Sequence, residues 1–252
     1  MSEYAVFSAE ELREATAGAW MENRMPENAI GIATDSRKPA GKLFLALKGE
    51  RFDAHTFLAD AIANGAAALC IAAGKTDQLP ADTVIPVLTV DDTLEAYQKI
   101  AHFHRKRFPA LKMAGVTGSV GKTSVKEMLR AICIAAAEQD ENAVLATAEN
   151  TNNQFGVPQN LLKLRENHRY AVIEMGTNHP GEIEPLTRCA APDVAAINSI
   201  APCHLEFLGS LYGVAVEKSA IFQGLPVDGT AVIPVSSPAP EVLAEKSAPY
   251  RT

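Results

Sequence analysis

The chain contains 252 residues, 47% of them hydrophobic, so it can bury a sizeable core and is long enough for two domains. Its formal net charge of −7 argues against broad binding to nucleic acids or to anionic membrane surfaces. No apolar run approaches the roughly 20 residues that span a bilayer, and residues 1–5 lack the basic start of a secretion signal, so we expect a cytoplasmic protein without membrane insertion.

The first part of the chain alternates short apolar runs with helical patterns. Apolar runs bounded by turn residues predict strands, and apolar residues at helical spacing predict helices. Pro109 ends the last of these helices and indicates a domain boundary near residues 108–110. We therefore predict a small N-terminal α/β domain over residues 1–108, with strands at 41–47, 67–71 and 84–90 and helices at 55–66 and 93–107.

A glycine-rich turn ending in Gly-Lys-Thr follows the apolar run 111–116. Glycines let backbone N–H groups converge on phosphate oxygens, and the N-terminus of the following helix adds partial positive charge. Lys122 would neutralise the outer phosphates, and Thr123 would offer its hydroxyl to Mg²⁺. Val116 replaces the first glycine of the usual expression, so a surface turn is the alternative. The order of strand, loop and helix favours an ATP site formed by Thr117, Gly118, Ser119, Val120, Gly121, Lys122, Thr123 and Ser124.

The pattern after residue 109 is that of a doubly wound, mostly parallel sheet. Near-continuous apolar strands alternate with helices, and such sheets bind ligands at the carboxyl ends of their strands. The sheet looks incomplete, because the chain ends soon after its last strand. We predict a P-loop-type central domain over residues 109–252, with strands at 111–116, 143–147, 170–174, 194–198 and 229–235. The helix after the loop is expected to bury Val125, Met128, Leu129, Ile132 and Ala136.

Polar residues follow two of these strands. Glu174 ends an otherwise buried run, and His204 follows the strand that ends near Ile200. An isolated carboxylate in an apolar strand is costly to bury unless it meets a cation or a donor, and a metal beside a triphosphate would provide that partner. A partly exposed strand end is the alternative for Glu174. For His204 taken alone, a hydrogen-bonded structural role is the better interpretation.

Two further segments lie at the predicted ligand edge. Residues 149–158 form a dense amide cluster, which could orient phosphate or carboxylate oxygens or could simply form self-capping turns. Residues 174–183 could equally be a helix cap. Lys218 lies among apolar residues on a predicted helix. The alkyl stem of such a lysine ordinarily packs along apolar surface while its charged end stays in water. Burial could instead lower its pKa enough for reaction with carbon dioxide, which would give a carbamate that can bind a metal.

Together these residues resemble the Mur ligases, ATP-dependent amide-forming enzymes of bacterial cell-wall precursor synthesis. The family's phosphate loop is similar to residues 117–123. The match is closer to the member that adds D-alanyl-D-alanine to UDP-MurNAc-tripeptide. The segments that carry this resemblance are 34–37, 43–55, 150–158, 174–183, 198–200, 204–206, 209–210, 218 and 221–222.

The resemblance implies a mechanism and its cofactors. The tripeptide's terminal carboxylate would attack the ATP γ-phosphate to give an acyl phosphate, which the amine of D-Ala-D-Ala would then attack, with Mg²⁺ assisting. Catalytic roles fall on Lys122, Glu174, His204 and Lys218. Thr123 would hold the Mg²⁺ of ATP, and Glu174, His204 and carbamylated Lys218 would organise a second metal near the acyl phosphate. Substrate binding falls on Asn152 and Asn153. Ser36 and Arg37 would lie near the UDP group in the N-terminal domain.

The family also has a third, carboxy-terminal domain, which this chain lacks. We therefore expect a fragment, monomeric, with small-molecule substrates. Two alternatives stay open. The first is a related ligase, either a sibling that adds one amino acid or a folylpolyglutamate-type ligase. The second is a nucleotide-binding module without catalytic activity.

Overall fold

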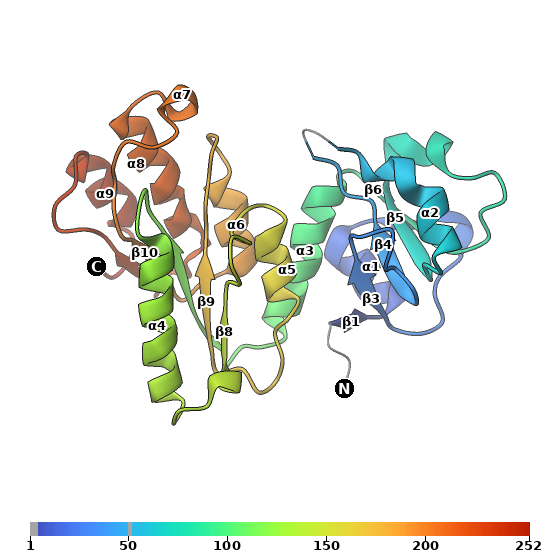
Figure 1. The fold of residues 1–252 in the computed structure, drawn as a ribbon, viewed down its shortest axis with the longest axis horizontal. Helices are drawn as coiled ribbons and strands as arrows, with labels where there is room; N and C mark the ends of the chain where they lie inside the picture. The colour runs from blue at the N-terminus through green and yellow to red at the C-terminus, as the bar shows by residue number, and fades with distance from the viewer. Residues whose placement is uncertain (1–4, 50–51) are drawn as a thin grey trace. The chain divides into compact units, whose positions relative to one another are not determined.

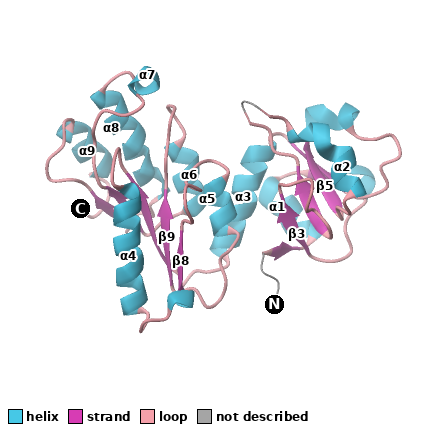
Figure 2. Ribbon diagram, viewed as in Figure 1, coloured by secondary structure: helices cyan, strands magenta, loops and turns pink. Residues whose placement is uncertain are grey.

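The computed structural model describes residues 5–49 and 52–252. Its contacts divide the chain into two compact units, Met1–Phe103 and His104–Thr252, and the division falls inside helix α3 (Thr93–Lys106). Helices and strands alternate along the chain (Figure 2), and the sheet of the second unit is parallel, so the predicted α/β fold class is confirmed. Glu50 and Arg51 of the amino-terminal motif, like residues 1–4, lie outside the described residues.

The sheet of the first unit has a parallel centre and antiparallel edges (Figure 1). Strands β3, β4, β5 and β6 run parallel in that order, while β1 pairs antiparallel with β3 and β2 pairs antiparallel with β6. Alternation cannot predict β1 and β2, because each has two residues. The strands are β1 (Val6–Phe7), β2 (Ala19–Trp20), β3 (Ile30–Ala33), β4 (Lys42–Leu45), β5 (Ala68–Ala72) and β6 (Val87–Val90).

Two elements of this unit differ from the prediction. The helix expected at 55–66 is a 3-10 turn followed by a short α-helix, because the Asp53 carboxylate accepts the His55 N–H at 3.1 Å and caps the turn. The strand expected from residue 84 begins after Pro86, which has no N–H to donate to a ladder. The helices are α1 (Ala9–Thr16), η1 (Met21–Asn23), η2 (Ala54–Phe57), α2 (Leu58–Ala63) and η3 (Ala73–Gln78).

The sheet of the second unit has the order β11-β10-β7-β9-β8, and all neighbours pair in parallel. The carboxyl ends of its strands therefore share one edge, and the loops that carry the predicted site residues leave from that edge. The strands are β7 (Lys112–Thr117), β8 (Val144–Ala146), β9 (Tyr170–Glu174), β10 (Val194–Ile197) and β11 (Thr230–Val232).

Helices cover this sheet, and one of them corrects a prediction (Figure 1). In α4 (Lys122–Ala136), Met128 and Ile132 are exposed, whereas Lys126 is the buried residue. Of the predicted apolar residues, Val125 and Leu129 are half-buried, whereas Met128, Ile132 and Ala136 are exposed. The remaining helices are η4 (Glu141–Ala143), α5 (Gly156–Leu161), α6 (Ile183–Ala190), α7 (Leu205–Leu208), α8 (Leu211–Ser219), η5 (Ala220–Gly224) and α9 (Pro240–Ser247). Within the described part of the chain, no helix is long and apolar enough to cross a membrane.

Candidate nucleotide and metal site

The glycine-rich loop joins β7 to the N-terminus of α4. Gly121, the residue before the helix, has φ +78°, which favours glycine. At Gly118 a Cβ would lie 1.6 Å from Asn198 Oδ1, so no side chain fits there. The Lys122 ammonium folds back over the loop and donates to the Gly118 carbonyl at 2.9 Å. The loop is therefore compact, and its lysine is held against the loop's own backbone.

The segment after β10 holds this loop in place through hydrogen bonds. Ser119 N–H donates to Ser199 O at 3.0 Å, and Val120 N–H donates to Ser199 Oγ at 3.1 Å. The Ser119 hydroxyl donates to Ala201 O at 2.9 Å, and Asn198 Nδ2 donates to Val120 O at 2.6 Å. The Ser119 and Val120 amides are thus engaged, whereas the N–H groups at the start of α4 have no intrahelical partner and could bind an anion. Ser199 is predicted only as part of the motif 198–200, since no local pattern indicates a contact with a residue 79 positions away.

Glu174 brings two other predicted residues together. Its carboxylate is 2% exposed; Oε2 accepts from Thr123 Oγ1 at 3.0 Å and Oε1 accepts from Asn152 Nδ2 at 2.8 Å. The strand end is thus not exposed, and the burial cost of the carboxylate is offset by these donors. Thr123, Asn152 and Glu174 form a compact oxygen-rich cluster beside the phosphate loop.

Asn153 is placed differently from its neighbour Asn152. Its Oδ1 accepts the N–H groups of Phe155 at 3.1 Å and Gly156 at 3.0 Å, so it forms the turn that starts α5. The fully buried Asn160 ties the same turn together, since its Nδ2 donates to Thr151 O at 3.0 Å. The amide cluster therefore has a structural part, and Asn152 is the member that contacts Glu174.

Lys218 on α8 is 1% exposed and is an electrostatic neighbour of Lys122 and Cys203. Burial lowers the pKa of Lys218 to about 8, and the Lys122 ammonium adds to this, while Cys203 and Glu217 oppose it. A buried amine with this pKa is partly neutral at physiological pH, which is the form that reacts with carbon dioxide. Cys203 in turn lies 3.3 Å from the Ser119 hydroxyl, so this group of residues adjoins the phosphate loop.

His204 is not joined to Glu174 by a hydrogen bond or ion pair. It adopts φ +49° as the N-cap of α7, and its carbonyl accepts the N–H groups of Phe207 and Leu208. Among the described residues, no three His, Cys, Asp or Glu side chains converge as a metal site. The hydrogen bonds therefore join Thr123 to Glu174, and they do not include the His204 side chain.

Two carboxylates shape the segment 174–183. Glu182 accepts the N–H groups of Asn178 at 2.7 Å and His179 at 3.1 Å, and these bonds outweigh burial, so that the pKa of Glu182 is lowered. Glu217 on α8 accepts the N–H groups of Gly181, Glu182 and Ile183 at 2.6, 3.0 and 2.9 Å. The segment is thus a loop and helix cap that is held by Glu182, which belongs to it, and by Glu217, which lies 34 residues after Ile183.

Removing the Glu217 carboxylate should destabilise the second unit. Glu217→Ala leaves the first turn of α6 without its acceptor, and we expect a loss of about 2 kcal/mol in the free energy of unfolding, measured with urea. Glu184→Ala is the matched control, because its pair with Arg188 on the same helix is exposed and should change stability by less than about 0.5 kcal/mol. Equal effects of the two substitutions would contradict the cap.

The predicted UDP-binding residues lie on an exposed turn after β3. Arg37 donates through Nε and Nη2 to the two carboxylate oxygens of Asp35, both at 2.8 Å, and this bond lowers the pKa of Asp35 to about 2. Ser36 O accepts from Asn64 Nδ2 at 3.0 Å. The guanidinium remains largely exposed, so Arg37 is accessible to an anionic ligand.

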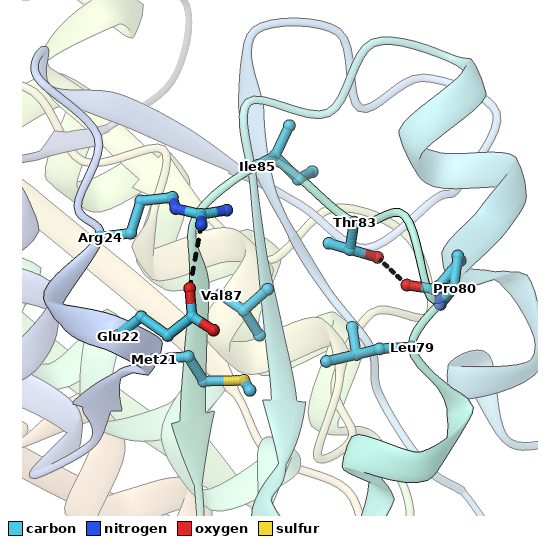
Figure 3. A pocket seen from close by; sticks show the side chains of 8 residues that line it. All are labelled: Met21, Glu22, Arg24, Leu79, Pro80, Thr83, Ile85 and Val87. Carbon is cyan, nitrogen blue, oxygen red and sulfur yellow. Dashed lines mark hydrogen bonds and ion pairs between the residues drawn. The ribbon is translucent and has the colours of Figure 1, made fainter.

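A hollow of about 150 Å³ lies in the first unit, beside β6. Figure 3 shows that the Arg24 guanidinium points to the Glu22 carboxylate, at 2.9 Å, and that Thr83 Oγ1 bonds to Pro80 O at 2.6 Å. Its apolar walls, Met21, Leu79, Ile85 and Val87, belong to or pack against the core. The polar side chains in the picture have partners within the chain, so we assign no ligand to this hollow.

Comparison with known proteins supports one family. Residues 116–251 match the model of the Mur ligase middle domain. The UDP-N-acetylmuramoyl-tripeptide--D-alanyl-D-alanine ligase of Escherichia coli (strain K12) is 47% identical over 203 residues, which are 80% of this chain and 42% of that protein. The Haemophilus influenzae enzyme of the same name is 46% identical, over 80% of this chain and 43% of that protein.

Solved structures agree. A crystal structure of MurF from Acinetobacter baumannii superposes with a TM-score of 0.89 at 37% identity, covering 99% of this chain and 53% of that chain. MurF ligase from Thermotoga maritima, in complex with ADP, gives a TM-score of 0.74 at 28% identity, covering 88% of this chain and 49% of that one. The chain thus spans about half the length of the relatives that it matches.

Proposed function

Because the chain belongs to the Mur ligase family, we propose that it is the nucleotide-binding part of a ligase that joins D-Ala-D-Ala to UDP-MurNAc-tripeptide with ATP. The observation that carries this proposal is the contact of Glu174 with Thr123 at the start of α4. It sets a buried carboxylate beside a phosphate loop whose lysine and first-turn amides can receive a triphosphate.

The residues at this site suit Mg²⁺. Thr123 Oγ1 and the Glu174 carboxylate are hard oxygen donors, and a carboxylate that is 2% exposed is favoured by a nearby cation. We assign Thr123 and Glu174 as its protein ligands. When bound, Mg²⁺ would neutralise charge on the phosphate oxygens. The assignment of His204 and carbamylated Lys218 to a second metal stays a prediction.

The chain's own residues can account for the activation of a carboxylate. A carboxylate resists attack by an amine, because oxide would have to leave, and transfer of the ATP γ-phosphoryl group supplies a phosphate leaving group instead. Charge grows on the phosphoryl oxygens during this transfer. Lys122 and the first-turn N–H groups of α4 would stabilise that charge, while Asn152 holds Glu174 in place. The acyl phosphate then accepts the amine of D-Ala-D-Ala, and phosphate leaves.

The UDP end of the substrate is assigned to the first unit. Arg37 is an exposed cation on the turn after β3, next to Ser36, and a guanidinium binds diphosphate oxygens well. Asn153 is assigned to substrate binding with Asn152, although its side-chain oxygen already accepts the N–H groups of Phe155 and Gly156.

Release of ADP separates a ligase from a binding module. The chain is mixed with ATP and Mg²⁺, and ADP is measured with and without UDP-MurNAc-tripeptide and D-Ala-D-Ala. ADP release that requires both substrates supports ligation by this chain. Nucleotide binding without substrate-dependent ADP release would identify a binding module, and release driven by a single amino acid or by a folate would identify a sibling ligase.

A further inference from the structure

The end of β8 departs from a regular parallel ladder. Thr147, the residue after the strand, donates its N–H to Val172 O at 3.0 Å. In a regular ladder its carbonyl would then accept the N–H of Glu174. Instead the Thr147 hydroxyl accepts that N–H at 2.8 Å, and the carbonyl is turned away from β9. The strand therefore leaves the sheet at the residue that precedes the Asn152 loop.

The ammonium of Lys126 bonds to the Thr147 carbonyl that has left the ladder. Lys126 Nζ donates to Thr147 O at 2.9 Å. In α4, which is described throughout, Lys126 is the buried residue, with 3% exposure, while much of the helix faces solvent. Burying a lysine is costly unless its charge is satisfied, and the Glu127 carboxylate at 2.7 Å supplies a counter-charge on the exposed side. An apolar side chain would fill this position at lower cost.

The contacts close a ring around the candidate metal ligand. Thr123 and Lys126 lie on adjacent turns of α4. Thr123 Oγ1 donates to the Glu174 carboxylate at 3.0 Å, Glu174 N–H donates to Thr147 Oγ1, and Thr147 O accepts from Lys126. The same exit of β8 leads to Asn152, whose Nδ2 donates to Glu174 and whose carbonyl accepts Gly176 N–H at 2.8 Å.

We propose that Lys126 is a positioning residue for the Glu174 carboxylate: by holding the Thr147 carbonyl out of the ladder, it keeps Glu174 between Thr123 and Asn152 in the geometry that Mg²⁺ requires. This inference rests on the proposed function for its metal, and on the ring of contacts alone for its geometry. Lys126 would thus act through Thr147 and Glu174 and not by contact with the nucleotide.

The test compares nucleotide binding with and without metal. For Lys126→Met, we expect affinity for Mg·ADP to fall about tenfold, while affinity for ADP in EDTA stays at the wild-type value, as measured by calorimetric titration. Lys126→Arg should restore most of the metal-dependent part. Glu127→Gln is the matched control, because it leaves the bond to Thr147 in place, and it should bind like wild type. Equal losses with and without Mg²⁺, or no loss, would overturn the proposal.

A second variant and a second measurement keep the test decisive if Lys126→Met does not fold or if the chain does not bind nucleotide. Thr147→Val removes the hydroxyl at the other side of the ring, and it should reproduce the loss if Lys126→Met does not fold. Amide hydrogen exchange of the free chain needs no ligand: Gly176 should exchange about tenfold faster in Lys126→Met, while Asn198, whose N–H donates to Thr117 O at 3.0 Å, should not change. If wild type fails to bind Mg·ADP, the proposed function fails, and unchanged Gly176 exchange would then overturn this inference separately.

Discussion

Replacing Lys122 with alanine is expected to weaken Mg·ATP binding at least about a hundredfold and to leave the free energy of unfolding unchanged. The Lys122 ammonium is half-buried and bonds to the Gly118 carbonyl at 2.9 Å, so it is held over the loop before any nucleotide arrives. A phosphate oxygen would replace a neutral carbonyl partner with a charged one. Calorimetric titration of both proteins with Mg·ATP measures the difference.

The control for this prediction is Lys112→Ala. Lys112 begins β7, the strand that leads into the same loop, but it is exposed and lies at the opposite, amino edge of the sheet. Its removal should leave Mg·ATP affinity at the wild-type value. Wild-type affinity in Lys122→Ala, or an equal loss in both variants, would contradict the assignment of phosphates to this loop.

The second large effect is a dependence of stability on pH that arises from Lys218. Burial lowers the pKa of Lys218 from 10.5 to about 8 in the folded chain. Between these pH values the unfolded chain holds a proton that the folded chain has lost, so stability rises with pH in this window. Below pH 8, by contrast, both states are protonated, and the full cost of burying the ammonium is present.

Lys218→Met removes that cost. We expect the variant to be more stable than wild type at pH 7, by up to about 3 kcal/mol, and we expect this difference to shrink as the pH rises from about 8 towards 10.5. Urea unfolding of both proteins at several pH values measures this difference in stability. Lys99→Met is the control, because Lys99 forms an exposed ion pair with Glu95, and it should show no such trend. A difference that is independent of pH would contradict the buried ammonium.

The same variant should lose function. If Lys218 reacts with carbon dioxide to form a carbamate, with release of a proton, the methionine variant cannot do so and ligation should be abolished although stability is gained. A carbamate signal from ¹³C-labelled bicarbonate, present in wild type and absent in Lys218→Met, measures the modification directly. A gain in stability together with full ligase activity would remove Lys218 from the mechanism.

Much of the second unit could be predicted from its sequence. The strand at 170–174 matches β9, because a buried parallel strand is a continuous apolar run with its own boundaries. The start of α4 could also be predicted, since the Gly-Lys-Thr pattern marks both the loop and the helix N-terminus. Both features depend on residues that are close together in the sequence, so a local pattern is enough to predict them.

The features that sequence missed depend on contacts between distant segments. Lys126 is buried while Met128 is exposed, and the partner of the Lys126 ammonium is the Thr147 carbonyl, which the apolar pattern of the helix cannot indicate. Asn152 and Asn153 look equivalent in the sequence, yet one contacts Glu174 and the other caps α5. Such assignments require the positions of the strand ends, which the sequence does not give.

Thr123 and Glu174 are proposed to hold the metal of a nucleotide bound at residues 118–123. Crystals of the chain grown with ADP and Mn²⁺ in place of Mg²⁺ test this proposal most directly, because Mn²⁺ can be located by its anomalous scattering. We predict a strong peak within bonding distance of Thr123 Oγ1 and the Glu174 carboxylate, with the ADP phosphates on Lys122 and the first turn of α4. A nucleotide bound elsewhere, or a metal that touches neither Thr123 nor Glu174, would contradict the account.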